Sequence, residues 1–363
     1  MANTCIRPGK ILLDTEGKRV QAHGGSIFYE NGIYYFYGEN KEYTTGENGI
    51  WTWGVRAYAS TDFYNWEDKG LIIEPVTDDE NSSLNPRTAM LDRPHIIYNK
   101  ETGKYVCWLK IMRTDGTQTE TVLTADSFLG PYTIVRDRLR PLGMNAGDFD
   151  IAVADDGKAY YYFERVHSET ICADLTPDYT DVTGYYSTHF PYHHPPYVRE
   201  ATAHFVRNYK HYLITSGTTG YLPNPSEAAV ADSWHGPFTV LGNPHPKDTS
   251  RTSFHSQISS VFKAPGKKDL YIALADRWAP ESMDIPYELC EKVCLYTCQG
   301  RRDEVGRLLE EYHITQEQLA RTNNTSIADY VWLPLRFVEP CPEYPGGMVL
   351  IDWVDEWRIE DYE

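Results

Sequence analysis

The chain has 363 residues, a length that fits several small domains or one large all-β unit. Its 52 acidic and 34 basic residues give a formal net charge of −18, which disfavours binding to nucleic acid or to anionic membrane surfaces. The 28 tyrosines and 9 tryptophans favour pleated strands over long helices or disorder. We therefore expect a folded, strand-rich protein without nucleic-acid or membrane partners, and the oligomeric state stays open.

The first residues, MANTCIRPGK, lead into charged DTEGKR without the apolar stretch of a secretory leader. The seven cysteines are scattered without a CxxC pair, so no disulfide framework is indicated. We expect a reducing, cytoplasmic setting, with secretion as the alternative if a leader has been removed. Cys290, Cys294 and Cys298 recur every four residues, but the letters VCLYTC favour a strand, and we expect neither a metal site nor a cofactor.

A turn followed by a tyrosine-led apolar run occurs five times along the chain. The copies are NGIYYFYGE (31–39), TGKYVCWLK (102–110), DGKAYYYFE (156–164), NYKHYLITS (208–216) and KKDLYIALA (267–275). The aligned tyrosines are Tyr34, Tyr105, Tyr160, Tyr212 and Tyr271. Their spacing leaves room in each unit for four strands and the turns between them.

Four of the units continue with a strand, a polar turn and another strand, at 59–70, 124–135, 172–184 and 230–242. Five such units predict an all-β, five-bladed β-propeller; a β-sandwich would not repeat at this period. The segment 301–322 has helical spacing of apolar residues and a capping-box pattern, so we expect a helical insertion in the last blade. Strands at 330–338 and 348–359 complete a single domain over 1–363.

Polar residues occupy one equivalent place in every unit, eleven to fourteen residues before the repeat tyrosine. They are His23, Asp92, Asp148, Glu200 and Gln257. The first strand of each propeller blade lines the central channel, so we expect these five side chains to converge on one funnel. For a single position a turn or capping role is the commoner interpretation, but three carboxyls in equivalent places favour a functional one.

Carboxyls around an aromatic-rich polar pocket suit glycoside hydrolysis, in which one carboxylic acid protonates the leaving oxygen. Burial and like charge raise the pKa of such an acid. The sequence has no Walker loop, HExxH, GxSxG or GxGxxG motif that would indicate phosphoryl transfer, a zinc protease or an α/β-hydrolase. His193 and His194 lack metal-ligand spacing, and we expect them in a loop that approaches the funnel.

At these residues the sequence resembles glycoside hydrolase family 43, and most closely its exo-β-1,3-galactanase branch. The resemblance covers nearly the whole chain. The matching segments are QAHGGSIFYENGIYYFYGENK (21–41), DRPHIIYNKETGKYVCW (92–108), DFD with DDGKAYYYF (148–163), EATAHFVRNYKHYLITSGTTGY (200–221), SQISSVF (256–262) and the terminal YVWLPLRF and IDWVDEW. The family implies a five-bladed propeller that hydrolyses glycosidic bonds with inversion.

The resemblance implies that Glu200 is the general acid and that Asp148 orients it and tunes its pKa. Most of the family has a general-base aspartate in the first blade, but here that place reads Ala22-His23-Gly24-Gly25. The galactanase branch shares this absence and is thought to position the attacking water with a glutamine, which Gln257 matches.

Asp92 stands where the branch has a glutamate, followed by Arg-Pro in both, and we expect it to help hold the water. Among substrate contacts, the branch implies Glu39 and Thr218. We also expect His23, one of the converging residues, to bind the substrate, together with Arg93 and Asp150, which lie beside Asp92 and Asp148.

The sequence thus predicts an inverting, exo-acting glycosidase that releases galactose from β-1,3-galactan or related oligosaccharides. The alternatives on the same scaffold are an α-L-arabinofuranosidase, a β-xylosidase or a β-galactofuranosidase. A non-catalytic sugar-binding propeller also stays open, because the first-blade aspartate is missing. A β-fructosidase would need a nucleophilic aspartate in an early WMNDPNG-like motif, which the sequence lacks.

Overall fold

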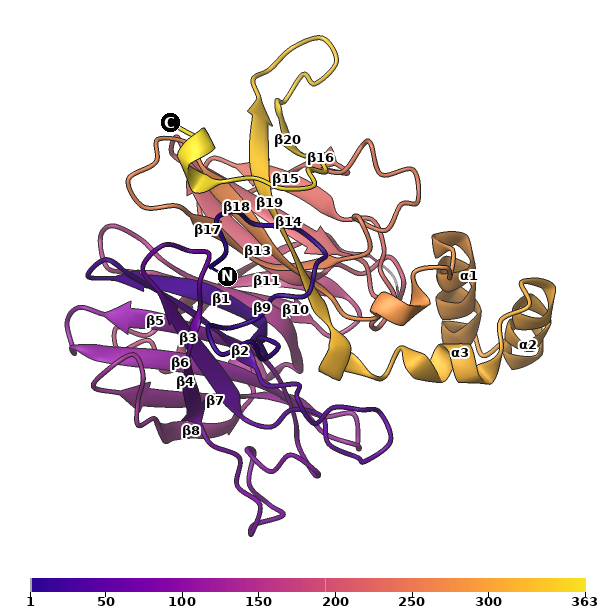
Figure 1. The fold of residues 1–363 in the computed structure, drawn as a ribbon, viewed down its shortest axis with the longest axis horizontal. Helices are drawn as coiled ribbons and strands as arrows, with labels where there is room; N and C mark the ends of the chain where they lie inside the picture. The colour runs from indigo at the N-terminus through magenta and orange to yellow at the C-terminus, as the bar shows by residue number, and fades with distance from the viewer. Residues whose placement is uncertain (1, 193) are drawn as a thin grey trace.

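The computed structural model describes residues 2–192 and 194–363. Its strands form five antiparallel sheets, each of four strands that follow one another in sequence (Figure 1). Blade 1 contains β1 (His23–Glu30), β2 (Ile33–Glu39), β3 (Val55–Ser60) and β4 (Glu67–Ile73). Blade 2 contains β5 (Met90–Asn99), β6 (Lys104–Met112), β7 (Gln118–Ala125) and β8 (Thr133–Leu139). Blade 3 contains β9 (Ala146–Val153), β10 (Ala159–Arg165), β11 (Glu169–Leu175) and β12 (Val182–His189). Blade 4 contains β13 (Glu200–Arg207), β14 (Lys210–Ser216), β15 (Glu227–Ala231) and β16 (Thr239–Gly242). Blade 5 contains β17 (Gln257–Lys263), β18 (Tyr271–Arg277), β19 (Asp329–Val338) and β20 (Met348–Ile351).

The first strands of successive blades contact one another, and β17 contacts β1, so the five sheets form a closed ring. The predicted five-bladed propeller is confirmed. The repeated tyrosine-led runs form the second strand of each blade, and the strands that were expected after them are β3–β4, β7–β8, β11–β12 and β15–β16.

In blade 2 the second strand and the outermost strand differ sharply in burial. In β6 the seven residues from Tyr105 to Ile111 are all buried, because both faces of the sheet pack against neighbouring blades. The outer strand β8 is almost entirely exposed. Apolar residues in the second strands therefore fix the blades against one another, and the few polar residues there have a different role.

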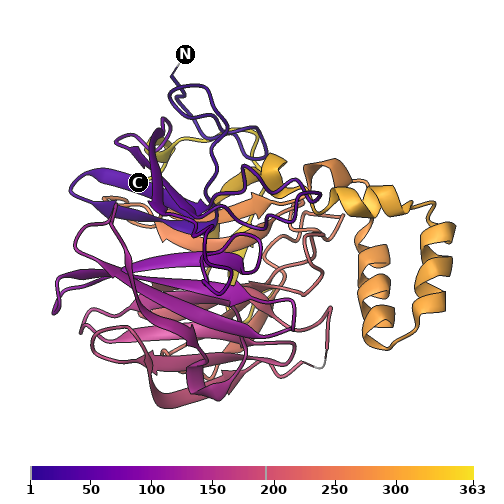
Figure 2. The same cartoon turned by 90° about the horizontal axis from the view of Figure 1, so that it is seen from below.

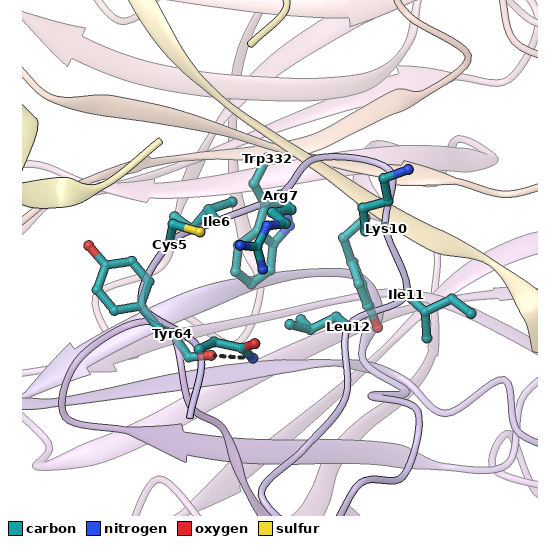
Figure 3. Close-up of a pocket in the computed structure, with 10 residues that line it drawn as sticks. Cys5, Ile6, Arg7, Lys10, Ile11, Leu12, Tyr64 and Trp332 are labelled. Carbon is teal, nitrogen blue, oxygen red and sulfur yellow. Dashed lines mark hydrogen bonds between the residues drawn. The ribbon is translucent and has the colours of Figure 1, made fainter. Parts of the chain in front are cut away.

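The ring closes between blades 1 and 5 without an exchange of strands. Instead, the segment before β1 crosses the junction: Ile6 pairs with Trp357, and Arg19 lies 2.6 Å from Asp329. An apolar cluster that includes Phe63, Trp66 and Trp332 fills the space between the two blades. Figure 3 shows a small pocket of about 130 Å³ beside this segment, lined in part by Cys5, Ile6, Tyr64 and Trp332.

Three helices lie between β18 and β19 and project from the side of the propeller (Figures 1 and 2). They are α1 (Tyr287–Cys298), α2 (Arg302–Glu311) and α3 (Gln316–Arg321). The insertion expected at 301–322 is present, and α3 begins with the predicted capping box of Thr315 and Gln318. Among the described residues, no helix is long and apolar enough to cross a membrane.

The expectation of a strand around 293–298 was wrong, because α1 contains these residues. Leu289 and Cys290 are buried on the face of α1 that packs against Leu308 and Leu309 of α2. Burial at this helical spacing overrides the strand preference of Val, Tyr and Thr. The insertion therefore begins at Tyr287.

Candidate active site

The first strands of blades 1, 2 and 4 have an irregular register directly after His23, Asp92 and Glu200. In each case the next residue adopts the left-handed conformation: Gly24 has φ 62°, Arg93 has φ 52° and Ala201 has φ 48°. Bulges of this kind turn a side chain away from the regular pleat. Two of these three residues carry a Cβ and are strained, and strain of this kind concentrates at functional sites.

The five converging residues His23, Asp92, Asp148, Glu200 and Gln257 form what we call the inner ring. A second set of polar residues, the outer ring, lies beside them on the second strands. Its members are Glu39, Lys110, Glu164, Ser216 and Asp276, which stand opposite or diagonal to the inner ring in the strand register. Apart from Glu39, sequence reasoning missed this ring, although each member follows its repeat tyrosine by four or five residues.

A cavity of about 430 Å³ opens at the end of the channel where the rings lie. Its volume falls in the range of small-molecule binding sites. Seven of the nine site residues expected from the sequence line it: Glu39, Asp92, Arg93, Asp148, Glu200, Thr218 and Gln257. Lys110 and Glu164 of the outer ring also line the cavity, and so do Thr322 and Asn323 from the end of the helical insertion.

The structure does not bring His23 or Asp150 into the cavity lining. His23 is fully buried, stacks on Tyr330 and places Nδ1 2.9 Å from Asp276 Oδ1. Asp150 follows Asp148 by two residues on the same strand face, which places it deeper in the channel. There it accepts a hydrogen bond from the His204 backbone N–H at 2.7 Å.

Of the two loop histidines, His194 is exposed, while the expectation for His193 lies outside the described residues.

Asp148 is held between two cations. Arg93 Nη2 lies 2.9 Å from Asp148 Oδ2, and Lys110 Nζ lies 2.7 Å from Asp148 Oδ1. Burial alone would raise the pKa of this carboxyl, but Arg93 and Lys110 hold the pKa below its usual range. Asp148 is therefore a carboxylate at neutral pH.

The Glu200 carboxyl is in the opposite protonation state. Enclosure by the cavity walls raises the pKa of its carboxyl well above the usual value, and the charge of Asp148 raises this pKa further. Lys110 and Arg93 oppose the shift without cancelling it. The cavity thus contains a protonated carboxyl and an ionised one in neighbouring blades, the division of roles that acid catalysis requires.

Gln257 is fixed by four hydrogen bonds. Its amide oxygen accepts from Arg93 Nη2 at 2.5 Å and from Trp278 Nε1 at 3.0 Å. Its amide nitrogen donates to Ser216 Oγ at 2.8 Å and to Glu200 Oε1 at 3.2 Å. The donors and acceptors around it leave one orientation of the amide, in which the NH₂ group faces the protonated carboxyl.

Asp92 and Glu39 share a second cluster of charges. Trp51 Nε1 donates to Asp92 Oδ1 at 2.6 Å, and Lys110 Nζ lies 3.7 Å from Asp92 Oδ2. Lys41 Nζ lies 2.8 Å from Glu39 Oε2. Burial raises the pKa of Glu39 to about 7, although Lys41 opposes the shift. Within the described residues, no group of His, Cys, Asp and Glu side chains is arranged to hold a metal ion.

Three aromatic side chains from different blades form one wall of the cavity. The ring centroids of Trp51 and Tyr221 are 5.6 Å apart with the planes inclined by 29°, and those of Tyr221 and Trp278 are 5.3 Å apart. Flat apolar surfaces of this kind pack against the C–H faces of sugars, while the surrounding charged groups bind hydroxyls. Sequence reasoning expected aromatic stacking in general but did not single out these residues.

A protonated carboxyl, an ionised carboxylate and an aromatic wall around one cavity fit the chemistry of glycoside hydrolysis. The family model described as "Glycosyl hydrolases family 43" matches residues 19–285. The chain therefore belongs to glycoside hydrolase family 43, and it is a glycosidase.

Solved structures of similar fold include two family 43 β-1,3-galactosidases, each 26% identical in sequence to this chain. One matches 99% of this chain and 64% of its own, with a TM-score of 0.74. This chain therefore spans less than two thirds of that protein. The other, solved with galactodeoxynojirimycin, matches 98% of this chain and all of its own, with a TM-score of 0.75.

An exo-β-1,3-galactanase from Phanerochaete chrysosporium, solved with β-1,3-galactotriose, is 22% identical and has a TM-score of 0.74. It matches 98% of this chain and 68% of its own. The exo-β-1,3-galactanase from Clostridium thermocellum is 24% identical, has a TM-score of 0.72 and matches 98% of this chain and 66% of its own. These two likenesses are likenesses of fold. No curated protein matches the chain by sequence.

Proposed function

We propose that the chain is an inverting, exo-acting β-1,3-galactosidase that releases galactose from the ends of β-1,3-galactan or related oligosaccharides. The observation that carries the proposal is the contact between Gln257 and Glu200, with Nε2 and Oε1 3.2 Å apart. The contact joins the neutral amide of Gln257 to the protonated carboxyl of Glu200. The first-blade position is occupied by His23, whose ring is directed at Asp276 instead of the cavity. The two family 43 β-1,3-galactosidases of similar structure support galactose as the sugar released.

In the proposed reaction, Glu200 donates its proton to the glycosidic oxygen as the bond to the leaving group breaks. Asp148 stays ionised between Arg93 and Lys110, and its charge keeps the proton on Glu200 until the substrate is in place. Gln257 and Asp92 hold the attacking water on the other face of the sugar, and Asp92 takes up the proton that the water loses as it attacks the anomeric carbon. The aromatic wall and Glu39 bind the sugar itself.

The test is hydrolysis of a panel of 4-nitrophenyl glycosides together with β-1,3-galactobiose. The panel contains the β-D-galactopyranoside, α-L-arabinofuranoside, β-D-xylopyranoside and β-D-galactofuranoside. We expect turnover of the galactopyranoside and of galactobiose, with α-galactose as the first anomer seen by proton NMR. Faster release of another sugar would overturn the substrate assignment, and β-galactose as the first product would overturn inversion.

A further inference from the structure

Glu164 carries a carboxyl that the proposed mechanism does not use. It lies near the end of β10 and is only 4% exposed. Its Oε1 accepts a hydrogen bond from the His167 backbone N–H at 2.7 Å. Among the described residues, no hydrogen bond or ion pair involves Oε2. Because Glu164 lines the cavity, this oxygen is available to a ligand.

The position of the Glu164 carboxyl depends on Gly147. A Cβ atom at residue 147 would lie 2.2 Å from Glu164 Oε2, so any other residue would displace the carboxyl. Gly147 directly precedes Asp148 in β9, which places Glu164 next to the ionised carboxylate of the inner ring. The absence of a side chain at Gly147 therefore leaves room for this oxygen at the cavity wall.

The cavity wall around Glu164 is built by other blades than the groups assigned to the released sugar. Gln118, His167 and Glu164 come from blades 2 and 3, whereas Glu39, Gln257 and the aromatic wall come from blades 1, 4 and 5. Gln118 Oε1 is buried and has no hydrogen-bond partner within the described residues. Gln118 Oε1 is thus enclosed by protein, and Glu164 Oε2 is the oxygen on this side that a ligand in the cavity can reach.

Burial, more than the charges around it, favours the neutral form of Glu164. Burial raises the pKa of Glu164 to about 7 and the Asp148 charge adds to the shift, whereas the His167 N–H and the Lys110 ammonium oppose it. Glu200, the other carboxyl that faces it, is itself protonated. A neutral carboxyl both donates and accepts hydrogen bonds, which suits a sugar hydroxyl.

We propose that Glu164 binds a hydroxyl of the leaving-group sugar and thereby determines which second sugar the enzyme accepts. The inference rests on the proposed function, because it takes the sugar near the aromatic wall to be the one released. The second sugar then continues past Glu200 along the wall formed by blades 2 and 3. Its hydroxyl fills the place that the partnerless Oε2 of Glu164 leaves open.

The experiment measures binding of galactose and β-1,3-galactobiose by calorimetry in the Glu200→Gln background, which cannot protonate the leaving group. The extra affinity for the disaccharide reports contacts with the second sugar. We expect Glu164→Ala to reduce this extra affinity about tenfold and to leave galactose binding unchanged. Glu164→Gln keeps the shape and hydrogen-bonding capacity of the neutral acid and should retain most of it. Asp156→Asn, in an exposed turn of the same blade, is the matched control.

The inference would be overturned if galactose and β-1,3-galactobiose bind equally well before Glu164 is changed. It would also be overturned if Glu164→Ala leaves the extra affinity for the disaccharide unchanged. An equal loss for both sugars would overturn it as well, because that loss would place Glu164 at the released sugar. If galactose does not bind at all, the proposed function fails separately. The same pair of measurements, on the sugar that the glycoside panel identifies and its disaccharide, then decides the role of Glu164.

Discussion

The ammonium group of Lys110 lies 2.7 Å from Oδ1 of Asp148, on the neighbouring blade. The same nitrogen is 3.7 Å from Oδ2 of Asp92, its partner in the strand register. One buried cation therefore holds two carboxyls of the inner ring in place. Although burial disfavours its charge, Asp148 and Asp92 raise the pKa of Lys110, so it stays protonated.

Lys110→Met should reduce kcat/KM about a hundredfold, because Asp148 and Asp92 lose their shared partner and shift. It should also move the acid limb of the pH–rate profile. The pKa of Asp148 is held low by Arg93 and Lys110, so loss of one cation raises this pKa, and activity disappears at a higher pH as the solution is acidified. Lys104→Met, at the half-exposed start of the same strand, is the control. An unchanged acid limb would contradict this account.

Glu200→Gln should lower kcat on an oligosaccharide by about 10²- to 10⁴-fold, because the amide cannot give a proton to the leaving oxygen. The loss should be much smaller for a 2,4-dinitrophenyl glycoside, whose leaving group needs no proton. Steady-state kinetics on both substrates check this, with the exposed Glu101→Gln as the control. Equal losses on the two substrates would argue for a general disturbance of the site.

Asp150→Asn should become more stable relative to the wild type as the pH rises from 4 to 7. Burial raises the pKa of Asp150 from 3.8 to about 7. In that interval the folded wild type binds a proton that the unfolded chain has lost, so Asp150 contributes a loss of stability as the pH rises. The loss is up to about 1.4 kcal/mol per pH unit.

Melting temperatures of the two proteins across this range test the prediction. The difference between them is the informative quantity, because buried histidines that do not contact Asp150, such as His245, whose pKa burial lowers to about 4, have the opposite effect on both proteins. Asp156→Asn should follow the wild type at every pH. A constant difference between Asp150→Asn and the wild type would show that Asp150 keeps its ordinary pKa.

Trp51→Phe should lower kcat/KM about tenfold while it preserves the melting temperature. The phenyl ring keeps the contact with Tyr221, but the N–H that donates to Asp92 Oδ1 at 2.6 Å is lost. Trp53→Phe, two residues away in the same loop and packed on Tyr43, is the matched control. If both variants lose activity to the same degree, the loop as a whole matters and the indole hydrogen bond does not.

The fold could be predicted because the sequence repeats it. Tyr34, Tyr105, Tyr160, Tyr212 and Tyr271 mark the same strand in five blades, and each copy supports the others. The helix α1 had no such support, since it occurs once and its strand-favouring residues are overruled by contacts with α2. The intrinsic secondary-structure preference of a segment predicts its conformation poorly where long-range packing determines that conformation.

The candidate site was predictable to the extent that the repeat places polar residues at equivalent positions. Glu200, Asp148, Asp92 and Gln257 do line one cavity. His23 occupies the same place in its blade, but its ring bonds to Asp276 instead, a contact between residues 253 apart in sequence that no local pattern reveals. The outer ring was hidden because its members lie within apolar runs that read as strand core.

Each blade supplies its inner and outer ring residues from a single hairpin, so the chemistry of the cavity is divided into five short, contiguous pieces of chain. A change in one hairpin that preserves the contacts between blades, such as that of Lys110 with Asp148, alters one sector of the pocket and leaves the other sheets intact. New specificities can therefore evolve, or be engineered, one sector at a time, by exchange of a hairpin of about twenty residues instead of a redesign of the whole protein.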